Sequence, residues 1–398
     1  MKNILYIDSF ALVGRRGAKD EKEAWTTEQL LDEMAHCGIH GALICHDLAR
    51  LYDPAFGNRE LAAELKKSPR LYGCWVLMPH QCGEMPSGQE IVKQMLINNI
   101  RAAKMCPKIH RYYFDEETCG EIFSALEEKD IPLLVEAVEP DPETLKEVGD
   151  VCRSHPALKV LFQGATWSDT RMMVPLMERH PNLYTEFSSL QANRAIEMFT
   201  KKFGPERLFF GTEALMKSPG AAKSFIDYAQ ISDEDRRLIA GENLARFLKL
   251  SSLPDEYERE CKEDAILARV KEGKPLDDIL VIDAHAHMVH RGGWGVGTIP
   301  MPYGDVGAMV ECYAVIGVGK FCASSWLGIT VDAEKGNEII REAMNMYPEK
   351  VIGYATIDPN YTKDMDAEIR KCHEKYGMKG LKPYYPYVKI PYNSPKYR

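Results

Sequence analysis

Several features that would place the chain in other protein classes are missing from its sequence. No apolar run approaches the roughly 18 residues needed to span a bilayer, and the first apolar run meets an Asp too early for a signal peptide. The 11 Cys include no C-x-x-C pair, and several lie inside apolar runs. This pattern argues against a zinc ribbon or a disulfide framework. We therefore expect a cytoplasmic protein with reduced thiols.

A concentration of positive charge is also missing. The chain has 50 Lys and Arg against 59 Asp and Glu, for a formal net charge of −9, and no basic stripe accompanies the tyrosines near its C-terminus. An acidic balance disfavours nucleic acids and membranes as partners. The expected partner is a small-molecule substrate, and association into a homo-oligomer stays open.

Short apolar runs alternate with longer amphipathic stretches as far as residue 250. Near-continuous apolar character is typical of strands buried on both faces. The strand candidates are 4–8, 41–46, 71–79, 100–105, 132–137, 159–164, 183–188 and 207–213. Strands alternating with helices over this length predict an α/β fold, a (β/α)₈ TIM-like barrel over residues 1–252. An open doubly wound sheet would give a similar alternation.

The pattern of the first strand returns late in the chain. ILYIDSFAL at 4–12 aligns with ILVIDAHAH at 279–287, an offset of 279 − 4 = 275. Further matches pair Gly73 with Gly353, Pro79 with Pro359 and Lys104 with Lys382. A repeat of this length indicates a tandem duplication of a domain and not a solenoid.

The repeat defines the expected domain organisation. Residues 253–278 are polar and charged, which suits a helical linker. Residues 279–398 should be the N-terminal half of a second barrel, with about four β/α units. Its strands are expected near 279–283, 318–324, 351–357 and 378–382.

His285 and His287 lie two residues apart on the first strand of this second copy. Side chains two apart on a strand point to the same face, so both imidazoles are placed to bind one metal ion. By the same two-residue period, Val281 is expected on the side of His285, and Leu280 and Ile282 on the opposite side.

Three segments carry a resemblance to a known family. DAHAH at 283–287 after an apolar strand resembles the first strand of the amidohydrolase superfamily, in the amidohydrolase-related branch that includes aminocarboxymuconate-semialdehyde decarboxylase-like enzymes. GMKGLKPYYP at 377–386 is similar to the fourth strand of that branch. ERLFFGTEALMKSP at 206–219, followed by the segment 231–250, is similar to its eighth strand and closing helix.

The resemblance implies a barrel that holds a divalent metal, usually zinc. In the family the metal ligands are the His pair of the first strand, a His of the fifth strand, often a His of the sixth strand, and an Asp of the eighth. In the first copy these positions hold Phe10, Leu12, Glu136, Gln163 and Glu213. No zinc is therefore expected in the first barrel. The second copy keeps His285 and His287, and further strands would have to complete its site.

The first barrel is nevertheless expected to be polar at the C-terminal ends of its strands. The residues expected around this opening are Asp8, His46, His80, Lys104, Glu136, Gln163 and Glu213. Three interpretations stay open: an internal ion-pair network centred on Lys104, a repurposed binding site, and an oxygen-rich Mg²⁺ or Mn²⁺ site. The last would use Asp8, Glu136 and Glu213.

Roles follow from these positions. The candidate catalytic residues are Lys104, Glu136 and Glu213, which we expect within one side-chain length of each other. The candidate binding residues are Asp8, His46, His80, Gln163 and Arg171. Arg171 and Trp167 follow the sixth strand, where they are placed to contact an anionic ligand.

Two hypotheses for the function remain. By family resemblance the protein is a metal-dependent hydrolase or decarboxylase of a small carboxylate or amide, with a degenerate first barrel. Alternatively the first copy is a non-catalytic pseudoenzyme that binds a small molecule or supports another domain, the chain being a fragment of a longer tandem protein. In either case the half-copy should not stay an isolated open sheet, but pack in a dimer or be completed by further chain.

Overall fold

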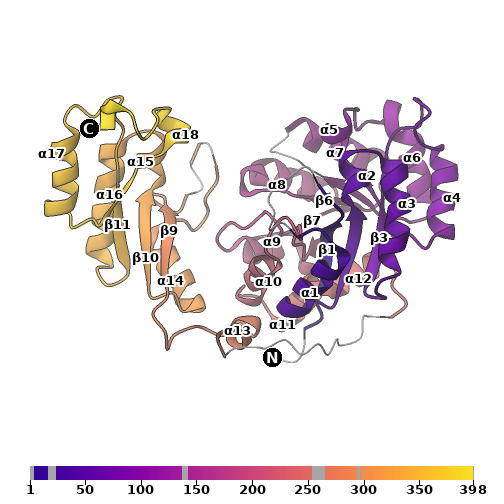
Figure 1. Ribbon diagram of the computed structural model, residues 1–398, viewed down its shortest axis with the longest axis horizontal. Coiled ribbons are helices and arrows are strands. Elements are labelled where there is room, and N and C mark those ends of the chain that lie inside the picture. The colour runs from indigo at the N-terminus through magenta and orange to yellow at the C-terminus, as the bar shows by residue number, and fades with distance from the viewer. Residues whose placement is uncertain are drawn as a thin grey trace. The chain divides into compact units, whose positions relative to one another are not determined.

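The computed structural model describes residues 4–16, 24–136, 142–252, 265–293, 296–297 and 299–397. The chain divides into two compact units, Met1–Asp264 and Ala265–Arg398, each with its own sheet (Figure 1). The cysteines within the described residues are free thiols. Among the helices that the structure describes, none has the length and apolar character needed to cross a bilayer.

The first unit is a TIM-like α/β barrel, which confirms the fold class. Its sheet is parallel, and the strands neighbour one another in chain order without the reversal of a doubly wound sheet. The strands are β1 Ile7–Val13, β2 Gly41–His46, β3 Leu71–Leu77, β4 Ala102–Met105, β5 Leu133–Glu136, β6 Val160–Gln163, β7 Leu183–Glu186 and β8 Leu208–Phe209.

The barrel is closed between β1 and the segment that follows β8. The N–H of Ser9 donates to the carbonyl of Phe210 (2.9 Å), and the N–H of Leu12 donates to the carbonyl of Ala214 (2.6 Å). β1 itself carries a bulge, because its pairing with β2 shifts between Asp8 and Ala11.

Helices follow the strands around the first unit. Local signals set their ends: Thr26 and Gln29 form a capping box at the start of α1, and Gly38 ends α1 with a φ of 75°. The helices are α1 Thr27–Cys37, α2 Asp47–Leu51, α3 Pro54–Leu65, α4 Gly88–Ile97, α5 Pro107–His110, α6 Glu116–Glu128, α7 Pro142–Ser154, α8 Thr170–Arg179, α9 Ala195–Phe203, α10 Pro219–Asp227, α11 Asp233–Arg237 and α12 Asn243–Phe247. Shorter turns are Trp167–Asp169, Pro205–Arg207 and the π-helical Leu238–Glu242.

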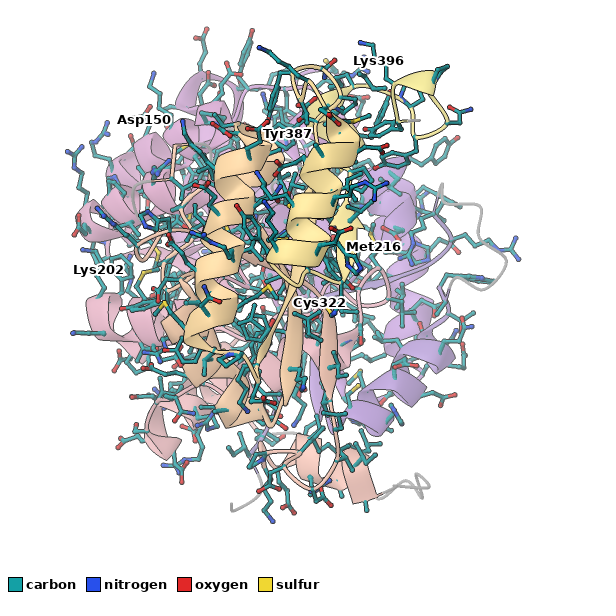
Figure 2. The ribbon with its side chains drawn as sticks, turned by 90° about the vertical axis from the view of Figure 1, so that its left-hand side faces the viewer. Asp150, Lys202, Met216, Cys322, Tyr387 and Lys396 are labelled. Carbon is teal, nitrogen blue, oxygen red and sulfur yellow. The ribbon has the colours of Figure 1, made fainter. Side chains whose placement is uncertain are left out.

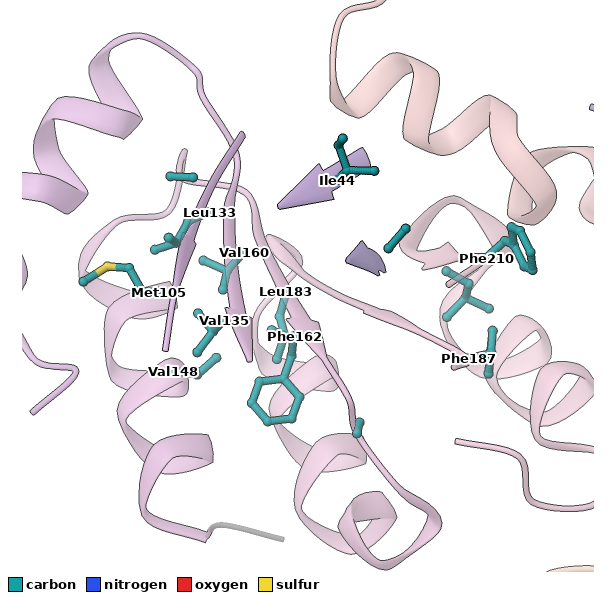
Figure 3. Packing of buried hydrophobic residues seen from close by; sticks show 14 of the residues in the cluster. Ile44, Met105, Leu133, Val135, Val148, Val160, Phe162, Leu183, Phe187 and Phe210 are labelled. Carbon is teal, nitrogen blue, oxygen red and sulfur yellow. The ribbon is translucent and has the colours of Figure 1, made fainter. Parts of the chain in front are cut away.

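Two apolar clusters lie on the two faces of the barrel wall. The outer cluster joins strands to helices, and Figure 3 shows Met105, Val135 and Phe162 gathered near Val148 of α7. The inner cluster fills the barrel; it includes Ile7, Phe10, Leu12, Leu43, Cys45, Leu134, Leu161 and Phe209. Alternate residues of each strand therefore enter different cores, which explains the near-continuous apolar runs.

The second unit is a four-stranded parallel sheet in the order β12-β11-β10-β9. Its strands are β9 Ile282–Met288, β10 Lys320–Ser325, β11 Val351–Thr356 and β12 Gly380–Lys382. Its helices are α13 Ala265–Lys271, α14 Val306–Ile316, α15 Trp326–Thr330, α16 Ala333–Met346, α17 Met365–Arg370 and α18 Tyr385–Val388, with shorter turns at Lys371–Lys375 and Pro395–Tyr397. α16 and α17 cover one face of the sheet (Figure 2). Of the expected linker at 253–278, residues 253–264 lie outside the described residues.

β9 carries a bulge that corrects one expectation from the sequence. Its pairing with β10 shifts between Asp283 and Ala286, so that β9 has one residue more than β10 over this step. The extra residue reverses the alternation of side chains. Ile282 therefore shares the face of His285, and Val281 lies on the opposite face, contrary to the two-residue period.

Candidate functional site

A buried ion-pair network occupies the C-terminal mouth of the first barrel. The ammonium of Lys104, at the end of β4, lies 2.8 Å from Oε2 of Glu136 at the end of β5. Nε of Arg50, on α2, donates to Oε1 of Glu136 over 2.5 Å. Only 2% of the Lys104 and Glu136 side chains is exposed. Of the interpretations left open by the sequence, the ion-pair network is the one whose contacts form.

The two cations decide the ionisation of Glu136. Burial alone would raise the pKa of its carboxyl, but Lys104 and Arg50 outweigh burial and the pKa is lowered. The pKa of Lys104 is raised, because Glu136 outweighs a burial that would lower it. Both groups are charged at neutral pH. Arg50, which the sequence analysis missed, also lies 3.6 Å from Asp47.

Phe10 and Leu12 fill the interior beneath this network. The Lys104 ammonium lies 4.0 Å from the centroid of the Phe10 ring, within the range of a cation–π contact. Phe10 and Leu12 are 2% and 1% exposed and belong to the inner cluster. Where the family resemblance calls for two imidazoles, the barrel therefore has a packed apolar floor capped by a cation.

Asp8 links the first strand to the last. Its carboxylate accepts hydrogen bonds from the N–H of Phe10 (2.9 Å), the N–H of Thr212 (3.0 Å) and the Thr212 hydroxyl. Burial raises the pKa of Asp8 to about 7, although these hydrogen bonds lower it. The role visible in these contacts is to hold the bulge of β1 against the segment after β8.

Gln163 and Glu186, the last residues of β6 and β7, hold neighbouring segments of the barrel by hydrogen bonds. Gln163 donates to the carbonyl of Ser9 over 2.8 Å. The Glu186 carboxylate accepts from the N–H of Gly164 (2.8 Å) and from the Ser188 hydroxyl (2.9 Å), and burial raises its pKa. The sequence analysis missed Glu186, although a carboxylate inside the apolar strand candidate 183–188 could have drawn attention to it.

No ion pair within the described residues joins Glu213 to Lys104 or Glu136, so the expected cluster of these three residues stays a prediction at Glu213. Glu213 has a left-handed φ of 54°, and its carboxylate lies 2.6 Å from the ammonium of Lys217. The chain turns sharply after β8, which pairs this carboxylate locally instead of across the barrel.

The remaining binding candidates have separate local contacts, and their meeting at one opening stays a prediction. His46 accepts from the N–H of Leu48 (3.1 Å) at the start of α2, and burial lowers its pKa. His80 lies 3.4 Å from Glu121 on α6. Arg171 is exposed on α8. The positions of these side chains depend on the direction of the loop after each strand, which the order of strands in the sequence does not reveal.

A pocket of about 460 Å³ opens between the segments that follow β6, β7 and β8. Lys217 lies at this pocket and donates to the Ser189 hydroxyl. Trp167 is half-buried there, and Ser188 and Thr212 are buried. The full lining is Thr166, Trp167, Ser188, Ser189, Gln191, Thr212, Lys217, Ser218 and Ala221.

The donors of the first barrel do not fit a divalent metal. Phe10 and Leu12 offer no donor atom, and Asp8, Glu136 and Glu213 have separate partners in Thr212, in Lys104 with Arg50, and in Lys217. Within the described residues, no group of three or more His, Cys, Asp or Glu side chains is placed to hold an ion. The alternative of an Mg²⁺ or Mn²⁺ site is therefore not supported.

The second unit brings two imidazoles together. Nε2 of His285 and Nε2 of His287 lie 3.0 Å apart, and Nζ of Lys382 lies 2.8 Å from Nε2 of His285. Nδ1 of His287 lies 3.0 Å from the Ser324 hydroxyl. Burial, followed by Lys382, lowers the pKa of His287 to about 4, so its ring is neutral. This pair fits two ligands of one metal, whereas a zinc site needs three or four.

Comparisons with known proteins agree with the barrel fold. Residues 100–250, which contain β4 to β8, match the family model described as amidohydrolase. An uncharacterised TIM-barrel protein from Bordetella bronchiseptica is 16% identical, with a TM-score of 0.50 over 62% of this chain and 99% of that chain. No curated protein matches the sequence.

Two further solved structures with this fold are decarboxylases. 5-Carboxyvanillate decarboxylase from Sphingomonas paucimobilis is 14% identical, with a TM-score of 0.50 over 62% of this chain and 99% of that chain. 2,6-Dihydroxybenzoate decarboxylase from Rhizobium is 14% identical, with a TM-score of 0.50 over 63% and 100%. At this identity the likeness establishes the TIM-like barrel fold and not an activity.

Proposed function

We propose that the first barrel is a non-catalytic domain that binds a small hydroxylated aromatic carboxylate. The assignment as non-catalytic is based on the position of Lys104, whose ammonium lies between the Phe10 ring and the Glu136 carboxylate. The centre of the mouth, where barrel enzymes carry out chemistry, is filled by a satisfied ion pair on an apolar floor. Lys104 and Glu136 are too buried to reach a substrate, which favours a structural role for both.

The ligand class follows from the pocket beside this network. The Trp167 indole offers a surface for an aromatic ring. The Lys217 ammonium, which also contacts Glu213 and Ser189, has a third N–H with which to bind a carboxylate. The hydroxyls of Thr166, Ser189 and Ser218 suit ring hydroxyls. The decarboxylases with a similar fold act on compounds of this class by name, which supports the choice of probes.

Isothermal titration calorimetry of the full chain with 2,6-dihydroxybenzoate and 5-carboxyvanillate tests the binding site. Lys217→Ala should weaken binding at least about 10-fold, because a charge-assisted hydrogen bond is lost. Lys146→Ala, an exposed lysine on α7, is the matched control and should bind normally. Equal affinity of Lys217→Ala and the parent chain would contradict the site.

Turnover tests the non-catalytic assignment separately. If the chain releases CO₂ from either compound, and the double variant His285→Ala/His287→Ala retains the full rate, the first barrel is a catalyst and the proposal fails.

The second candidate function is a metal-dependent hydrolase or decarboxylase centred on His285 and His287, with Zn as the expected metal. Their convergence to 3.0 Å favours it. A bound divalent ion would lower the pKa of a water molecule to near neutrality. In this chain the two imidazoles would hold the ion, and the Ser324 hydroxyl would orient the His287 ring.

Zinc titration followed by calorimetry tests the pair without an activity assay. The chain should bind one weak equivalent that is lost in His285→Ala/His287→Ala. His373→Ala, whose ring contacts the carbonyl of Met378 in the same unit, should bind zinc like the parent chain. Unchanged zinc binding by the double variant would exclude the pair as ligands.

A further inference from the structure

The sheet of the second unit repeats the pairing of β1 to β4. In both β1–β2 and β9–β10 the bulge falls at equivalent residues, Asp8 to Ala11 and Asp283 to Ala286. Each Asp accepts from the N–H two residues on, at 2.9 Å.

A buried asparagine occupies the equivalent place in both units, where its side chain binds the backbone of the third strand of each sheet. Asn58 on α3 bonds both the N–H and the carbonyl of Val76 on β3, and Asn337 on α16 bonds those of Thr356 on β11. Val76 pairs with Lys104, and Thr356 pairs with Lys382. Lys382 is therefore the counterpart of Lys104.

In the first unit both edges of this four-strand set are covered. The β1 edge is covered by the segment after β8, where Thr212 donates to Asp8. The β4 edge is covered by β5, where Glu136 neutralises Lys104. Each edge thus has one backbone partner and one polar side-chain partner.

The same edges are open in the second unit. Ile282 is 46% exposed where its counterpart Ile7 is 0% exposed, and Leu381 is 49% exposed where Ala103 is 0% exposed. Across the part of the second unit that the structure describes, no carboxylate lies within ion-pair distance of Lys382, whose ammonium contacts His285. Exposed apolar strand edges favour pairing with further strands.

We infer that the sheet β9–β12 is the docking surface for a four-stranded β/α half-barrel equivalent to β5–β8. The half-barrel carries a carboxylate at the end of its first strand, opposite Lys382, and a hydroxyl residue after its last strand, opposite Asp283. Charge complementarity favours this half-barrel over a second copy of the chain, which would bring no carboxylate to Lys382. A copied β9 would bring two more imidazoles toward Lys382, and Tyr313 already binds the one carboxylate on that strand. The inference is independent of the ligand proposed for the first barrel.

A chimera tests the surface with the chain's own β5–β8 half as the probe. A second copy of residues 105–252 is joined directly after Lys382, in place of 383–398, which keeps the spacing between β4 and β5. Hydrogen exchange of the Ala284 and His287 amides is measured, since their counterparts Ser9 and Leu12 donate across the closing edge. Both amides should slow at least about 100-fold relative to the 398-residue chain.

Charge reversal provides the matched control. Glu136→Lys in the appended copy alone places a lysine opposite Lys382 and should remove the protection, while the first barrel stays intact. Adding Lys382→Glu should restore it. Slow exchange at Phe321 on β10 reports in every variant that the second unit is folded.

Three results would overturn the inference. The first is full protection of Ala284 and His287 in a monomeric 398-residue chain. The second is protection that appears only on dimerisation of that chain, which would identify a second copy as the occupant. The third is a chimera whose β9 amides exchange as fast as in the parent chain while Phe321 stays protected.

Discussion

Lys104 is the central residue of the ion-pair network at the mouth of the first barrel. Its ammonium is fully desolvated, yet Glu136 and the Phe10 ring surround it, so that it remains charged. Phe10 and Leu12, at the positions where the family resemblance calls for two imidazoles, are thus accompanied by a polar network whose charges balance without a metal ion.

Removing Lys104 should strongly destabilise the first unit. In Lys104→Met the Glu136 carboxylate keeps only Arg50, and breaking a buried pair from one side costs about 3–5 kcal/mol. Urea unfolding followed by the fluorescence of the first unit measures this loss. The double variant Lys104→Met/Glu136→Gln should lose less than Lys104→Met, because no underpaired carboxylate remains. A double variant less stable than the single variant would contradict the assignment.

Asp8 should make stability fall as pH rises. Its folded pKa of about 7 lies above the unfolded value of about 3.9. Between these values the folded state binds more protons than the unfolded state, so stability decreases from about pH 4 to pH 7, by at most about 4 kcal/mol. Asp8→Asn should remove most of this slope. Burial also raises the pKa of Asp47 and Glu186, which leaves a residual slope.

The matched control for Asp8 is Asp150→Asn, an exposed carboxylate paired with Arg153. It should keep the slope of the parent chain, since an exposed ion pair contributes little. Equal slopes in Asp8→Asn and the parent chain, measured by urea unfolding at several pH values, would show that Asp8 is ionised throughout.

Among the elements, the helix–strand pairs α3–β3 and α16–β11 are joined by the same type of side-chain hydrogen bonding. A buried amide side chain, Asn58 or Asn337, takes both the donor and the acceptor of one residue on the neighbouring strand. In the first unit α3 also packs closely against α2, because a Cβ on Gly57 would lie 2.0 Å from the backbone nitrogen of Ala49 on α2. The helix is thereby locked in position along its strand.

Asn58→Ala and Asn337→Ala should each destabilise one unit. Each substitution leaves a buried N–H and a buried carbonyl without a partner, which costs about 2–4 kcal/mol. Hydrogen exchange at Ile44 of β2 and Phe321 of β10 reports on the two units separately. Each variant serves as the control of the other. Loss of protection in both units from either variant would mean that they fold as one.

For the whole molecule, separate cores predict separate unfolding. The hydrophobic clusters of the first unit and that of the second share no described residue. Differential scanning calorimetry of the full chain should therefore show two transitions, of which Lys104→Met lowers only the one belonging to the first unit. A single transition with equal calorimetric and van't Hoff enthalpies would contradict this expectation.

The sequence alone determined the barrel, because strands buried on both faces are apolar throughout and alternate with amphipathic helices. It also determined that Phe10 and Leu12 cannot bind a metal, since residue type decides this without coordinates. The ion pair of Lys104 with Glu136 could also be predicted from the sequence, because these residues lie at the ends of neighbouring strands.

Only the tertiary structure decided the remaining contacts. Whether Glu213 faces Lys104 or Lys217 depends on one left-handed residue after β8, and the partner of His80 depends on loop direction. The side of Val281 depends on a bulge, which adds one residue to a strand and reverses its alternation. These features arise where the backbone departs from the regular repeat of a strand or helix. A sequence pattern reveals only the regular repeat, so it could not predict them.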